Sequence, residues 1–202
     1  MKKILTFAIL LCSIGFVKAQ TRGTVGVNLY GSYNFQETVN LDYADVKISD
    51  GLQYGLGLEY FIRPSKSIEL KYNRQDANYD VTQYNIGPNT YYSGKGSLNY
   101  ILIGGNNYFI SNPGAKAVPY LGLSLGLGIV NGGKSSSEHF AWDIHGGVKV
   151  KTSGPVSVKL QAYLQEMVSS YGYDYYYYYA YPDYKSVLQF GLGAVLTFDF
   201  DK

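Results

Sequence analysis

Residues 52–62 read LQYGLGLEYFI, and this stretch decides the fold of the chain. Every second position, from Leu52 to Ile62, carries a large apolar residue, whereas the positions between Gln53 and Glu59 that alternate with them are small or polar. Successive side chains of a β-strand point to opposite faces, so a period of two residues marks a strand. The stretch predicts one strand with an apolar face and a polar face.

The same alternation recurs along the chain and predicts eight strands. The other seven fall near residues 24–33, 68–73, 98–109, 121–129, 140–150, 156–165 and 188–198. The pattern is weakest over 98–109, where Ile101 and Ile103 interrupt it. After Gln20 we find no helix-length window with apolar residues three and four apart, and the 23 Tyr and 24 Gly suit strands and turns. The chain is expected to be all-β.

The predicted connections alternate between short and long. Short ones with turn-forming residues lie around 63–66, 112–114 and 153–155, and long ones cover about 34–50, 77–95, 131–138 and 167–185. Short turns at one end and long loops at the other are typical of outer-membrane barrels. We therefore predict an eight-stranded antiparallel up-and-down transmembrane β-barrel.

Periodicity alone leaves open which face points inward, and a soluble lipocalin-like barrel is the alternative. Each predicted strand carries about five large apolar residues, close to what a tilted membrane strand needs, and eight such sets would crowd a narrow interior. The apolar faces are therefore expected to meet lipid. The other faces are expected to form a polar network that fills the lumen: Glu59, Glu69, Lys71, Asp143, His145, Lys149 and Lys159.

Aromatic residues are expected to mark the two membrane interfaces. One girdle would contain Tyr60, Tyr108, Tyr120, Phe198 and Phe200. The other girdle would contain Tyr54, Tyr72, Tyr100, Phe140 and Trp142.

The N-terminus is typical of an export signal. Lys2 and Lys3 precede an apolar run over 4–17, and cleavage after Ala19 would leave 20–202 as the barrel domain. The only cysteine, Cys12, lies within this signal peptide of residues 1–19, so the mature chain has no disulfide or thiolate site. We predict no metal and no cofactor, and a net charge of +2 gives no reason to expect nucleic acid.

The signal, the strand pattern, the alternating connections and a last strand ending Phe198-Asp199-Phe200 resemble small outer-membrane barrels of the OmpX and OmpA transmembrane-domain type. The resemblance covers nearly all of the mature chain. It implies a monomer in the outer membrane of a Gram-negative bacterium, in contact with membrane lipid and inserted by the barrel-assembly machinery. Such families usually end on an aromatic residue, whereas here Asp201 and Lys202 follow Phe200.

A tyrosine-rich segment over 171–184 is the main candidate for function. Tyrosine offers a large, rigid contact area and a hydroxyl that tolerates water, so it is common in binding surfaces. The segment predicts a binding loop for an unidentified extracellular ligand, or else rings that extend a girdle or pack on neighbouring loops. Its tyrosines are Tyr171, Tyr173, Tyr175, Tyr176, Tyr177, Tyr178, Tyr179, Tyr181 and Tyr184.

Two other functions are kept as alternatives to a structural or surface-interaction role. The first is a narrow pore through the lumen. The second is an acyl-modifying enzyme acting on lipid A, as the resemblance allows, with a nucleophile and a base near the outer leaflet. Ser135, Ser136, Ser137, Glu138 and His139 supply the residue types, but neighbouring residues of a strand point to opposite faces, and we assign no catalytic residue.

Overall fold

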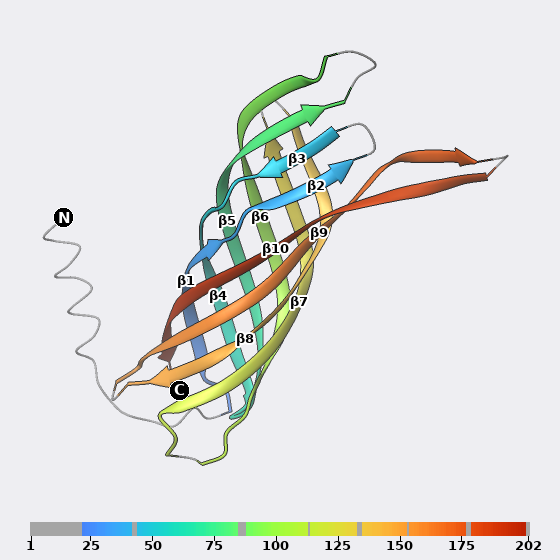
Figure 1. Cartoon of the computed structure of the whole chain (residues 1–202). Coiled ribbons are helices and arrows are strands. Elements are labelled where there is room, and N and C mark those ends of the chain that lie inside the picture. The colour runs from blue at the N-terminus through green and yellow to red at the C-terminus, as the bar shows by residue number, and fades with distance from the viewer. Residues whose placement is uncertain are drawn as a thin grey trace, which may run out of the picture.

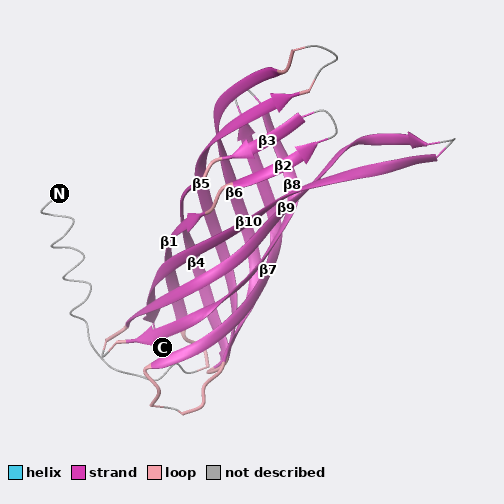
Figure 2. Ribbon diagram, in the orientation of Figure 1, coloured by secondary structure: helices cyan, strands magenta, loops and turns pink. Residues whose placement is uncertain are grey.

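The computed structural model describes residues 22–41, 44–84, 88–112, 114–132, 135–152, 154–176 and 179–200. These residues form ten strands of one antiparallel sheet, eight of which close into a barrel (Figure 1, Figure 2). The barrel strands are β1 (Val25–Asn34), β4 (Gly51–Arg63), β5 (Lys66–Gln83), β6 (Thr90–Tyr108), β7 (Ala117–Gly132), β8 (Ser135–Lys151), β9 (Val156–Tyr176) and β10 (Tyr179–Phe200). The predicted signal peptide lies outside the described residues. No helix in the described ranges is long and apolar enough to cross a membrane.

Pairing of the first barrel strand with the last closes the barrel. β1 pairs with β4 on one side and with β10 on the other, from Val25 opposite Phe200 to Asn34 opposite Gly191. β5 pairs with β6 and completes the ring. Every barrel strand thus has two neighbours for its backbone N–H and C=O groups, as a structure in hydrocarbon requires. The predicted antiparallel barrel of eight strands is confirmed.

The predicted apolar faces point outward. On β4, Leu52 and Leu58 are 71 % and 58 % exposed, whereas Gln53 and Glu59 are 2 % and 1 % exposed. The same alternation runs along β7, where Leu125 is half exposed and Ser124 is buried. This arrangement is the reverse of a lipocalin-like barrel, and it gives the outer surface the apolar character that lipid requires.

Three of the predicted girdle tyrosines are placed differently. Tyr100, Tyr108 and Tyr120 are all buried in the interior. Near the turn end, Tyr108 and Tyr120 stack at 5.4 Å and fill the lumen together with Phe61 and Val118. The girdle prediction was wrong for these residues because large rings are also needed to fill a lumen of this width. The other predicted girdle residues are exposed or partly exposed, namely Tyr54, Tyr60, Tyr72, Phe140, Trp142, Phe198 and Phe200.

The outer end, opposite the three short turns, contains more strand than predicted. β5 and β6 remain paired as far as Gln83 and Thr90, inside the predicted loop 77–95. The predicted loop 34–50 contains a hairpin of β2 (Glu37–Leu41) and β3 (Ala44–Ile48), and β3 pairs with β5. The Tyr84 hydroxyl donates to Asp45 at 2.5 Å in this outer sheet, which raises the pKa of Tyr84. Figure 1 shows the hairpin beside the mouth of the barrel.

Candidate functional site

All seven residues of the predicted polar network are buried in the lumen. The sheet register places like charges directly opposite each other, because Glu59 pairs with Glu69 and Lys149 pairs with Lys159. Such cross-strand pairs destabilise a sheet unless opposite charges offset them. The compensating opposite charges therefore have to come from strands that are not paired with these ones.

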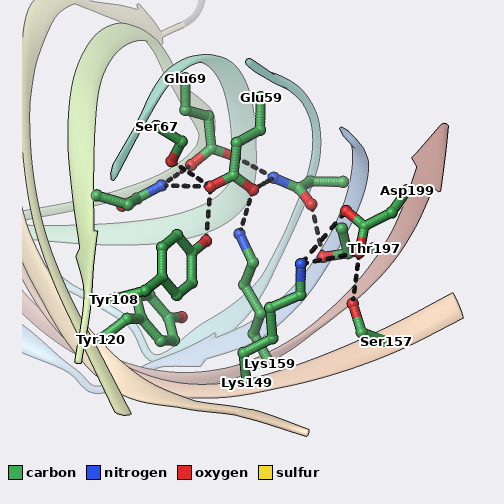
Figure 3. A network of polar contacts seen from close by, with 12 residues as sticks. Glu59, Ser67, Glu69, Tyr108, Tyr120, Lys149, Ser157, Lys159, Thr197 and Asp199 are labelled. Atoms are coloured by element: carbon green, nitrogen blue, oxygen red, sulfur yellow. Dashed lines mark hydrogen bonds and ion pairs between the residues drawn. The ribbon is translucent and has the colours of Figure 1, made fainter. Parts of the chain in front are cut away.

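Two ion pairs supply these opposite charges. Lys159 Nζ lies 2.6 Å from Glu59 Oε2, and Lys149 Nζ lies 3.0 Å from Asp199 Oδ2. The hydroxyls of Ser67 and Tyr108 donate to Glu59 Oε1 at 2.5 and 2.6 Å. Figure 3 shows both lysines reaching from the same wall toward these carboxylates. Burying charges is tolerated when pairing and further hydrogen bonds satisfy them, as they do here.

Asp199 belongs to this network although the sequence reasoning missed it. In the sequence it stands as the middle residue of the C-terminal Phe198-Asp199-Phe200 motif. The two-residue alternation of the last strand predicts an inward position for Asp199, because Asp199 lies on the same face as the inward residues Val195 and Thr197.

The Glu69 carboxylate is held by neutral donors. It accepts hydrogen bonds from the Tyr30 hydroxyl and from the side-chain amides of Asn28, at 2.5 Å, and Asn106, at 3.0 Å. Space for the carboxylate comes from Gly57, where an added Cβ would lie 2.7 Å from Glu69 Oε1. Small residues on the polar face therefore make room for buried charge.

A second ionic group lies beside the first and is connected to it through Asn106. Lys71 forms an ion pair with Asp143, whose Oδ1 lies 3.0 Å from His145 Nδ1. His145 Nε2 lies 2.7 Å from Asn106 Oδ1, while the amide nitrogen of Asn106 donates to Glu59 and Glu69. Six of the seven predicted residues thus form one connected network, drawn from β4, β5, β8 and β9. The seventh, Lys149, lies beside it, with its Nζ 5.8 Å from the ring centre of Tyr108.

Neutral polar side chains continue the filling toward the outer end. The Tyr163 hydroxyl lies within hydrogen-bond distance of Ser32, Asn34 and Gln53. The amide of Gln53, on β4, donates to Gln165, on β9, at 3.2 Å, and the Tyr100 hydroxyl, on β6, donates to Gln189, on β10, at 3.3 Å. Side chains from opposite walls thus meet at several levels, and the described residues fill the middle of the lumen.

An apolar layer covers this polar filling at the outer end. Its buried members are Ile48, Leu98, Tyr100, Leu102, Ala141 and Met167. Above the layer lies a cavity of about 370 Å³ with walls from β2, β3 and six of the barrel strands. The sequence reasoning missed this cavity because the β2–β3 hairpin that forms part of its wall was expected to be loop.

The Ser137 and His139 side chains, which were considered for acyl chemistry, lie at the edge of this cavity. His139 Nε2 is 2.9 Å from Ser137 Oγ, and the two residues share one face of β8. Among the hydrogen bonds of the described side chains, none joins His139 to a carboxylate. A catalytic serine needs a base that is itself oriented by a third group, so the geometry supports no catalytic assignment.

The tyrosine-rich segment is a strand hairpin and not the predicted loop. The backbone of Tyr171–Tyr176 belongs to β9, and that of Tyr179–Tyr184 belongs to β10. Tyr177 and Tyr178 lie outside the described residues, as do all side chains over 169–185. The proposed binding role of the nine tyrosines therefore stays a prediction.

The closed antiparallel barrel of eight strands has the fold of the small outer-membrane β-barrels. Solved structures of this class are similar to the chain. Neisserial surface protein A superposes with a TM-score of 0.56 at 16 % identity, over 88 % of this chain and 99 % of that one. Outer membrane protein OprG from Pseudomonas aeruginosa superposes with a TM-score of 0.61 at 12 % identity, over 93 % of this chain and 100 % of that one. No family model and no curated protein matches the sequence.

Proposed function

We propose that the protein is a non-conducting barrel of the outer membrane that acts through the strands at its outer end. The observation that carries this proposal is the filled lumen, in which ion pairs such as Lys159–Glu59 join opposite walls. An eight-stranded barrel is just wide enough for side chains to fill, so a filled interior leaves the outer surface as the functional part.

The outer surface of the barrel supports a position in lipid. Large apolar side chains are exposed around the ring, for example Leu58, Ile103, Leu123 and Leu160, each more than half exposed. An apolar surface of this extent is not stable in water and is the normal exterior of a membrane barrel.

The hairpin of β9 and β10 supports a surface-interaction role. The pairing of β8 with β9 ends at Val168, and the pairing of β1 with β10 ends at Asn34 and Gly191. Beyond these points, and beyond one further hydrogen bond from Phe35 N to Phe190 O, β9 and β10 pair only with each other among the described residues. Figure 1 shows the two strands projecting past the others. A two-stranded ribbon is marginal in water on its own, so an external partner would stabilise it.

Replacing the five tyrosines of 175–179 by serine tests this role. We expect barrel insertion and heat-modifiable migration to remain, because these residues lie beyond the closed ladder, and retention of protein-bearing vesicles on immobilised extracellular matrix to fall. The matched control replaces Tyr91 and Tyr92, which are exposed tyrosines on the outer part of β6. Unchanged retention together with lower unfolding stability would contradict the interaction role and assign these tyrosines to structure.

Planar-bilayer recording tests the closed lumen. The wild-type protein should give no discrete conductance steps in salt solution. Regular ohmic steps from the wild-type protein would overturn the non-conducting assignment and favour the narrow pore.

A further inference from the structure

The cavity at the outer end is built differently from the lumen beneath it. Its walls include Val39, Val46, Ala77, Val130 and Val187, and Met167 forms part of its floor. Among the described residues that line it, none is Asp, Glu, Lys or Arg. The lumen below contains buried lysines and carboxylates, so an apolar lining is not a general property of this interior.

The position of the cavity makes the apolar lining unexpected. The outer end of the barrel faces water, where polar side chains would cost nothing to hydrate. Apolar surface left in contact with water is unfavourable, and concave apolar surface with a few polar groups is the usual form of a small-molecule site. The lining therefore points to a ligand that removes it from water.

The polar groups of the lining are gathered at one edge. Ser137 is exposed, His139 is partly exposed, and their side chains are hydrogen-bonded to each other at 2.9 Å. Ser97 and Asn131 also line the cavity, on β6 and β7. A ligand seated on the valines would have a hydrogen-bonding group within reach of this edge.

Size and access restrict the ligand further. A volume of about 370 Å³ lies at the small end of ligand sites, which typically hold about 300–1,000 Å³. The ladders β5–β6, β6–β7 and β7–β8 continue to the outer end without interruption, the last as far as Gly132 opposite Ser135. This wall separates the cavity from lipid on that side, and the apolar layer closes it below.

We propose that the cavity binds a free single-chain amphiphile, with its aliphatic body among Val46, Val130 and Met167 and a hydroxyl or carboxylate head at Ser137 and His139. The site is independent of the tyrosine-rich hairpin. Because the lumen below is filled, the amphiphile is held at the outer end and does not pass through the barrel.

Met167 provides a direct reporter for this site. The chain has two methionines, Met1 in the predicted signal peptide and Met167, which is 1 % exposed. In a chain expressed without residues 1–19, labelling methionine methyl groups with carbon-13 marks Met167 and the initiator methionine. The protein is placed in lipid nanodiscs free of detergent, because detergent tails would compete for the cavity. Sodium decanoate, kept below its micelle concentration, is the probe.

We expect decanoate to shift the Met167 methyl resonance in a saturable way. Val130→Trp places a large ring in the cavity and should abolish the saturable shift, whereas the matched control Leu125→Trp faces lipid from the same strand and should leave it unchanged. His139→Ala should raise the Kd for decanoate about three- to tenfold, as expected for loss of one hydrogen bond to a charged head.

Three outcomes would overturn the proposal. A shift that grows linearly without saturation would show that decanoate only partitions into the membrane. An equal saturable shift in a folded Val130→Trp variant would place binding elsewhere. A Met167 resonance that responds to the acyl-chain length of the nanodisc lipid and not to decanoate would identify membrane lipid as the occupant. If Val130→Trp loses heat-modifiable migration, Ala77→Phe fills the same cavity from β5 and replaces it in the test.

Discussion

Lys159 Nζ lies 2.6 Å from Glu59 Oε2, and this ion pair joins β9 to β4, two strands that are not neighbours in the sheet. Backbone ladders hold each strand only to the next one around the ring. The ion pair instead ties opposite walls across the lumen. The interior network therefore fixes the cross-section of the barrel as well as neutralising its own charges.

Removing one partner of this pair should destabilise the barrel strongly. Lys159→Met leaves Glu59 buried beside Glu69 without its ammonium partner, and a broken buried pair typically costs about 3–5 kcal/mol. Urea unfolding in lipid vesicles measures the effect. Lys66→Met, at the exposed first residue of β5, is the control and should change the free energy of unfolding by less than about 0.5 kcal/mol.

A second substitution should recover much of this loss. Combining Lys159→Met with Glu59→Gln removes the unpaired charge, so the double variant should be more stable than Lys159→Met alone. Additive losses in the double variant would show that the ion pair is not the source of the effect.

The two faces of β7 should respond oppositely to substitution. Leu125→Arg places a charge against hydrocarbon and should cost about 2–4 kcal/mol if the residue lies near the bilayer midplane. Ser124→Ala, at the adjacent inward position, should cost far less. Reversible unfolding from vesicles compares them, and a larger loss for Ser124→Ala would show that the faces are assigned wrongly.

Gly122 should be sensitive to a single added methyl group. A Cβ there would collide with the side chains of Asn106 and His145, so Gly122→Ala should cost about 1–3 kcal/mol through overpacking. Gly105→Ala is the matched control, because its Cβ would meet only Ser67 O at 3.5 Å. Equal unfolding midpoints for the two variants would exclude a space-making role for Gly122.

Loss of the Tyr163 hydroxyl should weaken the filling above the ionic network. Tyr163→Phe leaves the polar side chains of Ser32, Asn34 and Gln53 without this neighbour and should cost about 1–3 kcal/mol. Tyr100→Phe removes a hydroxyl with a single longer hydrogen bond to Gln189, 3.3 Å, and should cost less. Denaturant titration of both variants gives the order, and the reverse order would contradict the role assigned to Tyr163.

The sequence predicted the barrel well where lipid acts on it. Along β4 and β7, hydrocarbon lies outside and a polar lumen lies inside, so apolar and polar residues alternate strictly. The polarity of residues such as Leu58 and Glu59 therefore predicts which of them points outward. The buried position of the seven ionisable side chains could be expected for the same reason. Their partners across the lumen could not, because strand order alone does not give which opposite side chains meet.

The two-residue alternation of apolar and polar residues is lost where a strand lacks either lipid on its outer face or a polar lumen on its inner face. On β6, Leu102 faces the apolar layer while Ile101 and Ile103 face outward, so apolar residues occur on both faces. At the outer end the ladders continue into water, and no lipid imposes a pattern on β2, β3 or the end of β5. The two-residue hydrophobic period therefore could not predict the strands at the outer end or the cavity that they enclose.

The pairing of β1 with β10 joins the first and last described strands of the chain. Contacts between such distant segments form slowly, because the entropy of closing a long loop must be overcome before they form. Until the two strands meet, each has a row of amide groups without a partner, and hydrocarbon offers none. A chain cut within β10 should therefore stall before integration into the bilayer instead of forming a smaller barrel, so that synthesis of the final strand sets the earliest time at which any part of the protein can enter the membrane.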